Sequence, residues 1–261
     1  MMLASLDSNE VRPVAAASDP AIYSAPGWLV MAGEQSIALQ RFNTRTVKVE
    51  GDPESVSGGV RSLMLSWGRA LSAPNQRVLA FVPGESGEVR ELIWVDRSGK
   101  QLSVASQPGA YFTVRLAPDG RRILASRREA GGLGIWLLDP ARQVHTKLMT
   151  DGRPATYPAW SPEGSEAGFT LNGNQVFKRK VDGTGSLEPL TSGPGEANLR
   201  DWSGDGRILY ESAAGSSNLD LWIVDLKGDR KPQVLANSPA NEREGAFAPP
   251  VDGKVTWVAY N

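Results

Sequence analysis

Short apolar runs alternate with polar turns along the whole chain. In the segment that begins at Tyr111, the runs cover residues 111–116, 122–126, 135–139 and 146–149, so each is four to six residues long. They contain β-forming residues, and no helical period connects them. The pattern predicts four short strands joined by turns, and the segments before and after it repeat the same plan.

A turn motif marks each repeat. It reads Ala117-Pro118-Asp119-Gly120, then Ser161-Pro162-Glu163-Gly164, then Ser203-Gly204-Asp205-Gly206. Altered copies begin at Ala73 and Ala248, so successive copies start 44, 44, 42 and 45 residues apart, and a degenerate copy begins at Ser24. A fixed period of about 40–45 residues is typical of propellers, in which each repeat forms one blade.

The repeat predicts an all-β fold, a six-bladed β-propeller of four-stranded antiparallel blades. Residues 243–261 hold only a first and a second strand, and residues 1–17 hold only a third and a fourth. We expect these N- and C-terminal strands to pair and close the last blade, because closure protects exposed sheet edges. The predicted blades within this single domain, 1–261, are 21–65, 66–108, 109–152, 153–195 and 196–242, with 1–17 and 243–261 sharing the sixth.

Large aromatic residues recur at one position of the repeat. They lie in the third run of four successive repeats, at Trp94, Trp136, Phe177 and Trp222. A row of aromatic residues on one exposed face would form a stacking platform for a ligand. We expect packing between neighbouring blades instead, because a blade must bury both of its faces.

Composition and charge exclude several classes of partner. The formal net charge is −1 at pH 7, and lysine and arginine are scattered, so we expect no binding to nucleic acid or to an anionic membrane surface. The chain has no cysteine, which excludes disulfides and thiolate metal sites but leaves the compartment undecided. No apolar run approaches the roughly 18–20 residues of a membrane helix, and the first residues do not resemble a signal peptide. We expect a monomer with no membrane contact by this chain.

Catalytic motifs are missing from the sequence. The only histidine, His145, falls at the start of an outer strand, where we expect an exposed edge position. The sequence contains no Gly-x-Ser-x-Gly elbow, phosphate-binding loop or dinucleotide fingerprint, and its acidic residues are dispersed. We therefore predict no catalytic residues, no metal site and no cofactor.

The loops that lead into the first strands offer a candidate binding site. In a propeller these strands are innermost, so their entry loops meet at one mouth of the axial channel. Tyrosine and arginine are enriched at binding hot spots. We predict that a protein segment or a small ligand binds there, at Arg61, Tyr111, Tyr157, Asn198, Arg200 and Arg243. Two alternatives are that these residues close the channel with hydrogen bonds and water, and that Arg200 is held by its neighbour Asp201.

The chain resembles a known family. Aromatic residues before the turn, as in Trp160-Ser161-Pro162-Glu163-Gly164 and Trp202-Ser203-Gly204-Asp205-Gly206, look like the TolB-like (WD-repeat-like) propeller repeat. The segments 92–100, 201–207 and 220–232 resemble more closely the propeller at the C-terminal end of certain bacterial serine/threonine protein kinases. The resemblance covers almost the whole chain, although the turns at Ala73 and Ala248 depart from the pattern. The chain has no kinase nucleotide loop or catalytic loop.

The repeat and the absence of a catalytic set predict a non-catalytic recognition or scaffold propeller, which the resemblance also implies. The resemblance further implies the sensor or interaction domain of a bacterial kinase, in the extracytoplasmic (periplasmic) part of a membrane protein; the residues themselves do not specify a location. One alternative is a propeller hydrolase or lyase with a central divalent metal, which would need carboxylates or histidines that converge on the axis. The other is a purely structural or engineered propeller segment.

Overall fold

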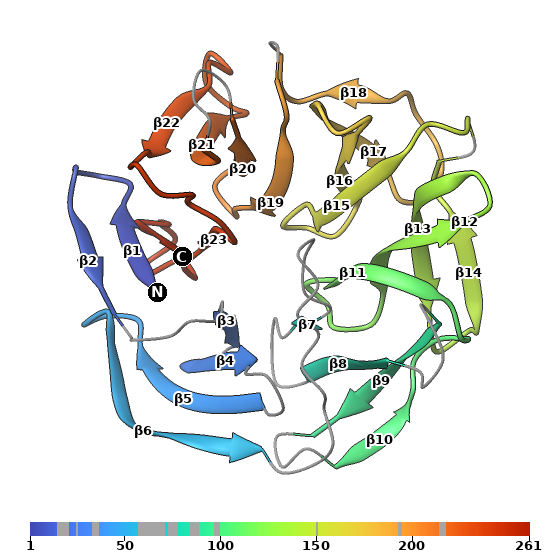
Figure 1. Ribbon diagram of the computed structural model, residues 1–261, viewed down its shortest axis with the longest axis horizontal. Helices are drawn as coiled ribbons and strands as arrows, with labels where there is room; N and C mark the ends of the chain where they lie inside the picture. Colours follow the sequence, from blue (N-terminus) through green and yellow to red (C-terminus); the bar gives the residue numbers. More distant parts are fainter. Residues whose placement is uncertain are drawn as a thin grey trace. The chain divides into compact units, whose positions relative to one another are not determined.

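The computed structural model consists of β-strands and connecting turns. It describes residues 1–14, 21–24, 26–32, 37–56, 71–72, 78–83, 89–96, 100–149, 151–192, 195–213 and 218–261. Six four-stranded antiparallel sheets account for the 24 strands (Figure 1). Within these described ranges, no helix is long and apolar enough to cross a membrane.

The chain divides into two compact units. The middle unit is Asp19–Gly152, and the terminal unit joins Met1–Ser18 to Arg153–Asn261. Each unit contains three of the sheets.

The three sheets of the middle unit each use four consecutive strands. The first sheet contains β3 (Ala21–Ser24), β4 (Trp28–Ala32), β5 (Ile37–Asn43) and β6 (Lys48–Val56). The second contains β7 (Leu71–Ser72), β8 (Val78–Pro83), β9 (Arg90–Val95) and β10 (Gln101–Val104). The third contains β11 (Ala110–Leu116), β12 (Ile123–Glu129), β13 (Gly132–Asp139) and β14 (Val144–Lys147).

The terminal unit has two further sheets of consecutive strands and one composite sheet. The first contains β15 (Ala155–Trp160), β16 (Glu166–Leu171), β17 (Gln175–Lys180) and β18 (Glu188–Pro189). The second contains β19 (Asn198–Trp202), β20 (Arg207–Ser212), β21 (Asp220–Asp225) and β22 (Gln233–Ala236). The composite sheet has the order β2-β1-β24-β23 and contains β1 (Met2–Ser5), β2 (Val11–Pro13), β23 (Ala246–Phe247) and β24 (Trp257–Tyr260).

The two ends of the chain pair as expected. Strand β1 lies antiparallel to β24, with Leu3 opposite Ala259 and Ala4 opposite Val258. Leu3 and Ala4 are each only 2% exposed, so the N-terminal strand is part of the core. The composite sheet thereby gives each end of the chain a hydrogen-bonded partner.

The prediction of a six-bladed propeller needs a correction. Five of the six sheets are continuous blades, each made of four consecutive strands, whereas no single stretch of the described chain forms a sixth. The structure also separates into two compact units. It therefore supports five continuous blades and one composite sheet, not one six-bladed ring. The repeat period reports the local plan of four consecutive strands, and it carries no information about how the sheets group.

The turn motif folds in the same way in three blades. The amide N–H of Gly120 donates to the carbonyl of Ala117, and Gly164 and Gly206 donate likewise to Ser161 and Ser203, at 2.8, 2.9 and 3.1 Å. All three glycines have positive φ, between 69° and 97°, a conformation that costs glycine least. The motif is therefore the tight connection between the first and second strands, as the sequence predicts.

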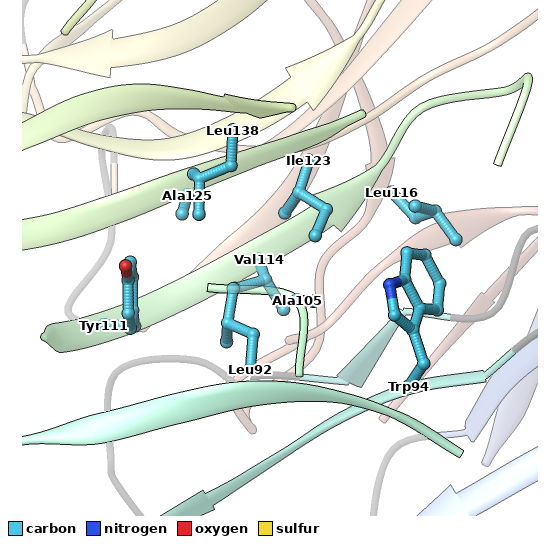
Figure 2. Packing of buried hydrophobic residues seen from close by; sticks show 9 residues of the cluster. All are labelled: Leu92, Trp94, Ala105, Tyr111, Val114, Leu116, Ile123, Ala125 and Leu138. Atoms are coloured by element: carbon cyan, nitrogen blue, oxygen red, sulfur yellow. The ribbon is translucent and has the colours of Figure 1, made fainter. Parts of the chain in front are cut away.

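Apolar side chains from neighbouring sheets form shared clusters. One cluster joins Leu92 and Trp94 of the second sheet to residues of the third, including Val114 and Ile123 (Figure 2). Another joins the two sheets of consecutive strands in the terminal unit, from Val176 to Ile208.

The recurring aromatic position contributes to these clusters. Trp94 is 8% exposed, and Trp136 and Trp222 are partly buried and pack against a cluster. Phe177 is also partly buried. Packing between neighbouring sheets is therefore confirmed for the three tryptophans, although two of them keep part of the ring in solvent.

Shortening a buried side chain of the N-terminal strand should destabilise the terminal unit. We predict that Leu3→Ala lowers the free energy of unfolding by about 2–5 kcal/mol, because a fully buried leucine leaves a cavity. The control is Leu102→Ala on β10, where the side chain is 55% exposed and the expected change is within about 0.5 kcal/mol. Urea denaturation measures both. Equal effects of the two variants would mean that β1 is not part of the folded core.

A close approach of two sheets should make Gly245 intolerant of a side chain. A Cβ at this position would lie 2.7 Å from Cδ2 of Leu209 and 2.9 Å from Cδ2 of Leu221, both fully buried. We predict that Gly245→Ala destabilises by about 1–3 kcal/mol through overpacking. At Gly204 an added Cβ meets nothing within 4 Å, so Gly204→Ala is the matched control in the same melting experiment. A neutral Gly245→Ala would show that the two leucines have room to move.

Candidate functional site

Bulges interrupt the first strands of three blades. The register with the second strand shifts between Tyr111 and Thr113 in β11, between Thr156 and Ala159 in β15, and between Leu199 and Asp201 in β19. The residues at the shifts are Phe112, Tyr157 with Pro158, and Arg200. A bulge changes the direction of a side chain and frees backbone groups from the ladder. Proline is tolerated there because it has no N–H to contribute.

The side chain at one position of the second strand accepts a hydrogen bond from a backbone N–H of a first strand or of the segment just before one. Counted from the first apolar residue of the second strand, which is Ile123, Ala167 or Ile208, this position is the fourth residue. It is Ser126 in β12, Thr170 in β16 and Glu211 in β20, and all three are buried. The N–H of Thr113 donates to Ser126 Oγ at 3.1 Å, and the N–H of Leu199 donates to Thr170 Oγ1 at 2.9 Å.

Glu211 occupies the same position with a carboxylate. The N–H of Glu244 donates to Glu211 Oε1 at 2.7 Å. The repeated position therefore supplies an acceptor to a buried amide, as buried backbone groups require. In this one copy of the three, the acceptor carries a charge.

The charge of Glu211 is balanced by Arg200. Nη2 of Arg200 donates to Oε2 of Glu211 at 2.6 Å, and the two side chains are 6% and 0% exposed. Nη1 of Arg200 lies 3.6 Å from Oε1 of Glu244. Burial raises the pKa of Glu211, and the neighbouring guanidinium of Arg200 opposes that shift. Loss of Arg200 would leave Glu211 buried without a countercharge, and loss of Glu211 would leave Arg200 with only the more distant Glu244.

Arg200 in turn lies against Tyr157. The guanidinium carbon is 4.7 Å from the centre of the tyrosine ring, within the range of a cation–π contact. Burial is the main cause of the raised pKa of Tyr157; Arg200 opposes the shift, and Glu211, Glu196 and Glu244 reinforce it. Tyr157 and Arg200 thus lie on the bulges of first strands in two neighbouring blades.

The backbone is unusual at two of these residues. Tyr157 has φ of 51° and Glu244 has φ of 56°, in the left-handed region that non-glycine residues seldom occupy. Such conformations persist only where the surrounding structure enforces them, and they are enriched at functional sites. We call the group Tyr157, Glu196, Arg200, Glu211 and Glu244 the Tyr157 cluster.

The Tyr157 cluster has an excess of negative charge. It contains three carboxylates and one guanidinium, and that guanidinium is occupied by Glu211. Glu196 is exposed, whereas Tyr157 and Glu244 are partly buried. An aromatic ring beside accessible carboxylates suits a positively charged group of a ligand.

The structure locates the predicted binding residues in different surroundings. Tyr157 and Arg200 come together, but Arg200 is 7% exposed and points its charge at Glu211 rather than at solvent. Asn198 is 4% exposed, and its Nδ2 donates to Oε1 of Glu196 at 2.7 Å. Arg243 is exposed, and its backbone exchanges hydrogen bonds with Asn261.

Two of the predicted binding residues remain. Tyr111 belongs to the middle unit and is one of the nine labelled side chains of its apolar cluster, with no exposed surface (Figure 2). Its hydroxyl donates to the carbonyl of Gln107 at 3.0 Å. Arg61 lies outside the described residues.

The pairing of Arg200 with Asp201, the alternative considered from sequence, does not form the central contact. The carboxylate of Asp201 accepts from the N–H of Trp202 and of Phe247, both at 2.8 Å. Sequence reasoning missed Glu211, Glu244 and Glu196. Glu211 could have been identified from the sequence, because a glutamate stands there at the position where two other repeats have serine or threonine.

The remaining candidate groups for chemistry lie elsewhere or do not cluster. His145 is on β14, partly buried, and its pKa is lowered mainly by burial and further by Arg127. Within the part of the chain that the structure describes, no three His, Cys, Asp or Glu residues are placed to hold a metal ion.

Sequence comparison finds partial relatives. No protein-family model matches the chain. An uncharacterised protein of Agrobacterium fabrum, Atu1656, is 28% identical over 153 residues, which cover 56% of this chain and 50% of that protein. The chain therefore spans about half the length of the curated relative that it matches.

Structural comparison finds β-propellers. A putative TolB from Agrobacterium tumefaciens aligns with a TM-score of 0.72 and 17% identity, over 100% of this chain and 97% of that one. TolB from Acinetobacter baumannii aligns at 0.60 and 16%, over 100% and 63%. An oligogalacturonate lyase in complex with manganese aligns at 0.58 and 14%, over 92% and 76%. At these identities the likeness shows the fold alone, which is that of TolB-like β-propellers.

Proposed function

We propose that this chain is a non-catalytic recognition module that binds a positively charged group of a protein segment or small ligand at the Tyr157 cluster. The observation that carries the proposal is the contact of the Tyr157 ring with the guanidinium of Arg200 at 4.7 Å, together with the carboxylate of Glu244 3.6 Å from Nη1 of that arginine. The exposed carboxylate of Glu196 accepts from Asn198, which lies on the same strand as Arg200. A cation near this surface would contact an aromatic face and carboxylate oxygens together.

The buried ion pair supports this role by positioning Tyr157. Arg200 is held by Glu211 at 2.6 Å and lies under the tyrosine ring, so it acts on the ligand through Tyr157. A preorganised ring loses less freedom when a ligand binds. We place recognition ahead of a metal-dependent hydrolase or lyase, and ahead of a purely structural segment, because this specific geometry supports recognition.

The resemblance to kinase-linked propellers suggests the biological setting. In this proposal the module is the sensor or interaction domain of a bacterial serine/threonine kinase, on the extracytoplasmic side of the membrane. A TolB-like fold supports an interaction role, because propellers present loops from several blades at one surface.

Removing one partner of the buried Arg200–Glu211 ion pair should destabilise the protein more than replacing both partners with apolar residues. We predict that Glu211→Ala destabilises by about 3–5 kcal/mol, because it leaves Arg200 buried without its main countercharge. The double variant Arg200→Met/Glu211→Leu should recover much of that loss. As a control, Glu129→Ala removes a partly solvent-accessible pair with Lys147 at 2.7 Å, in which the side chains are 30% and 35% exposed, and should cost only about 1 kcal/mol. Chemical denaturation measures all three. A double variant as unstable as Glu211→Ala would contradict this account of the pair.

Binding itself is tested with short peptides. We predict that the amide of Gly-Arg-Gly shifts the ring resonances of Tyr157 in an NMR titration, whereas Gly-Glu-Gly amide does not. Glu196→Gln keeps the acceptor for Asn198 but removes the charge, and it should weaken binding by about threefold or more. Glu163→Gln, in the turn between β15 and β16, is the matched control and should leave the affinity unchanged. Equal shifts from both peptides, or none at Tyr157, would reject the proposed site.

A further inference from the structure

A second surface of the terminal unit is a wide groove that the Tyr157 cluster does not use. It lies between the β1–β2 hairpin, residues 4–11, and strands β21 and β22. Its volume is about 770 Å³, within the roughly 300–1,000 Å³ of ligand sites. We call it the β2–β22 groove.

The floor of the groove is apolar and continuous with the core. Leu6 and Leu235, which line it, pack against the cluster that joins Ala4 to Leu209 and Val258. Ile223, also in the lining, is 8% exposed. A groove with a floor fixed by the core keeps its shape before a partner arrives.

Two exposed valines border this floor. Val11 is 47% exposed on β2, and Val234 is 45% exposed on β22. Both strands are the end strands of their sheets in the observed strand order. End strands present backbone N–H and C=O groups to which an extended peptide can add, while alternate side chains of that peptide enter pockets. The groove therefore favours an extended segment with aliphatic side chains.

The charges in the lining favour a basic partner. The lining contains the carboxylates of Asp7, Glu10 and Asp225 and a single guanidinium, Arg207. Arg207 is already occupied, because it pairs with Asp205 and donates to the carbonyl of Val255 at 2.7 Å.

Two of the three carboxylates pair with cations that do not line the groove, the exposed Lys254 and the partly buried Arg12. Asp7 pairs with Lys254 at 2.9 Å, and Glu10 pairs with Arg12 at 3.3 Å. The exposed Asp7–Lys254 pair is of a weak kind, so a lysine or arginine of a partner can replace Lys254 there.

We propose that the β2–β22 groove is a docking site for an extended peptide segment of a protein partner, in which aliphatic and basic side chains alternate. The aliphatic side chains contact Val11, Val234 and the apolar floor, and the basic ones pair with the carboxylates. This site is separate from the Tyr157 cluster and does not depend on the function proposed there.

The test uses a fluorescein-labelled octapeptide of alternating lysine and valine. Titrations are run with the full chain carrying Glu196→Gln, so that cation binding at the Tyr157 cluster is weakened, and the groove variants below separate the two sites. We expect saturable binding that weakens as salt rises. The peptide of alternating glutamate and valine should not bind, and the peptide of alternating lysine and serine should bind at least about fivefold more weakly.

Variants locate the bound peptide. Val234→Lys should weaken binding by about fivefold or more, and Glu10→Lys should do the same through charge alone. The matched control is Val144→Lys on β14, where the valine is 50% exposed outside the groove, and its effect should stay within about twofold. Circular dichroism verifies that each variant is folded. The proposal is overturned by the absence of saturable binding at about 1 mM, by equal binding of the lysine–serine peptide, or by equal effects of Val234→Lys and Val144→Lys.

Discussion

The structure depends on hydrogen-bond acceptors for buried backbone N–H groups in the bulged first strands and in the segments that lead into first strands. A bulge frees backbone groups from the ladder, and a buried amide without an acceptor is costly. One position of the second strand supplies that acceptor in three blades, as Ser126, Thr170 or Glu211. Thr170 also donates to the carbonyl of Ala197 at 2.8 Å, so a single side chain ties β16 to the first strand of the next blade. This side chain therefore connects two neighbouring sheets through hydrogen bonds.

The candidate site is a consequence of the same constraint. Where the acceptor is glutamate, a charge enters the interior, and it is tolerated because Arg200 on the neighbouring bulge faces it at 2.6 Å. Arg200 then contacts the ring of Tyr157, which stands on the bulge of the preceding blade. A structural requirement for one hydrogen bond has thus produced an ordered chain of polar groups. That chain ends at a surface with accessible carboxylates.

The terminal unit combines this polar network with an apolar one. The N-terminal strand completes a sheet with the C-terminal strands, and the cluster around Ala4 and Val258 fixes it to the neighbouring blade. The β2–β22 groove borders this junction, because the β1–β2 hairpin and the outer strands of the next blade line opposite sides of it. Two chemically distinct surfaces therefore arise within one unit, one from buried charge and one from the exposed edges of packed sheets.

The sequence alone determined the local structure of this protein. Strand length, turn chemistry and the pairing of the two ends follow from residue patterns, because a Pro-Asp-Gly turn between short apolar runs has few alternatives to a hairpin. Tyr157 and Arg200 were also identifiable, since both enter first strands. Side-chain direction was not, because a one-residue bulge in β19 decides whether Arg200 faces solvent or Glu211. Burial of Tyr111, the partner of Arg200 and the grouping of sheets into two units were set by tertiary packing. They depend on contacts between residues distant in sequence, which a repeat period does not encode.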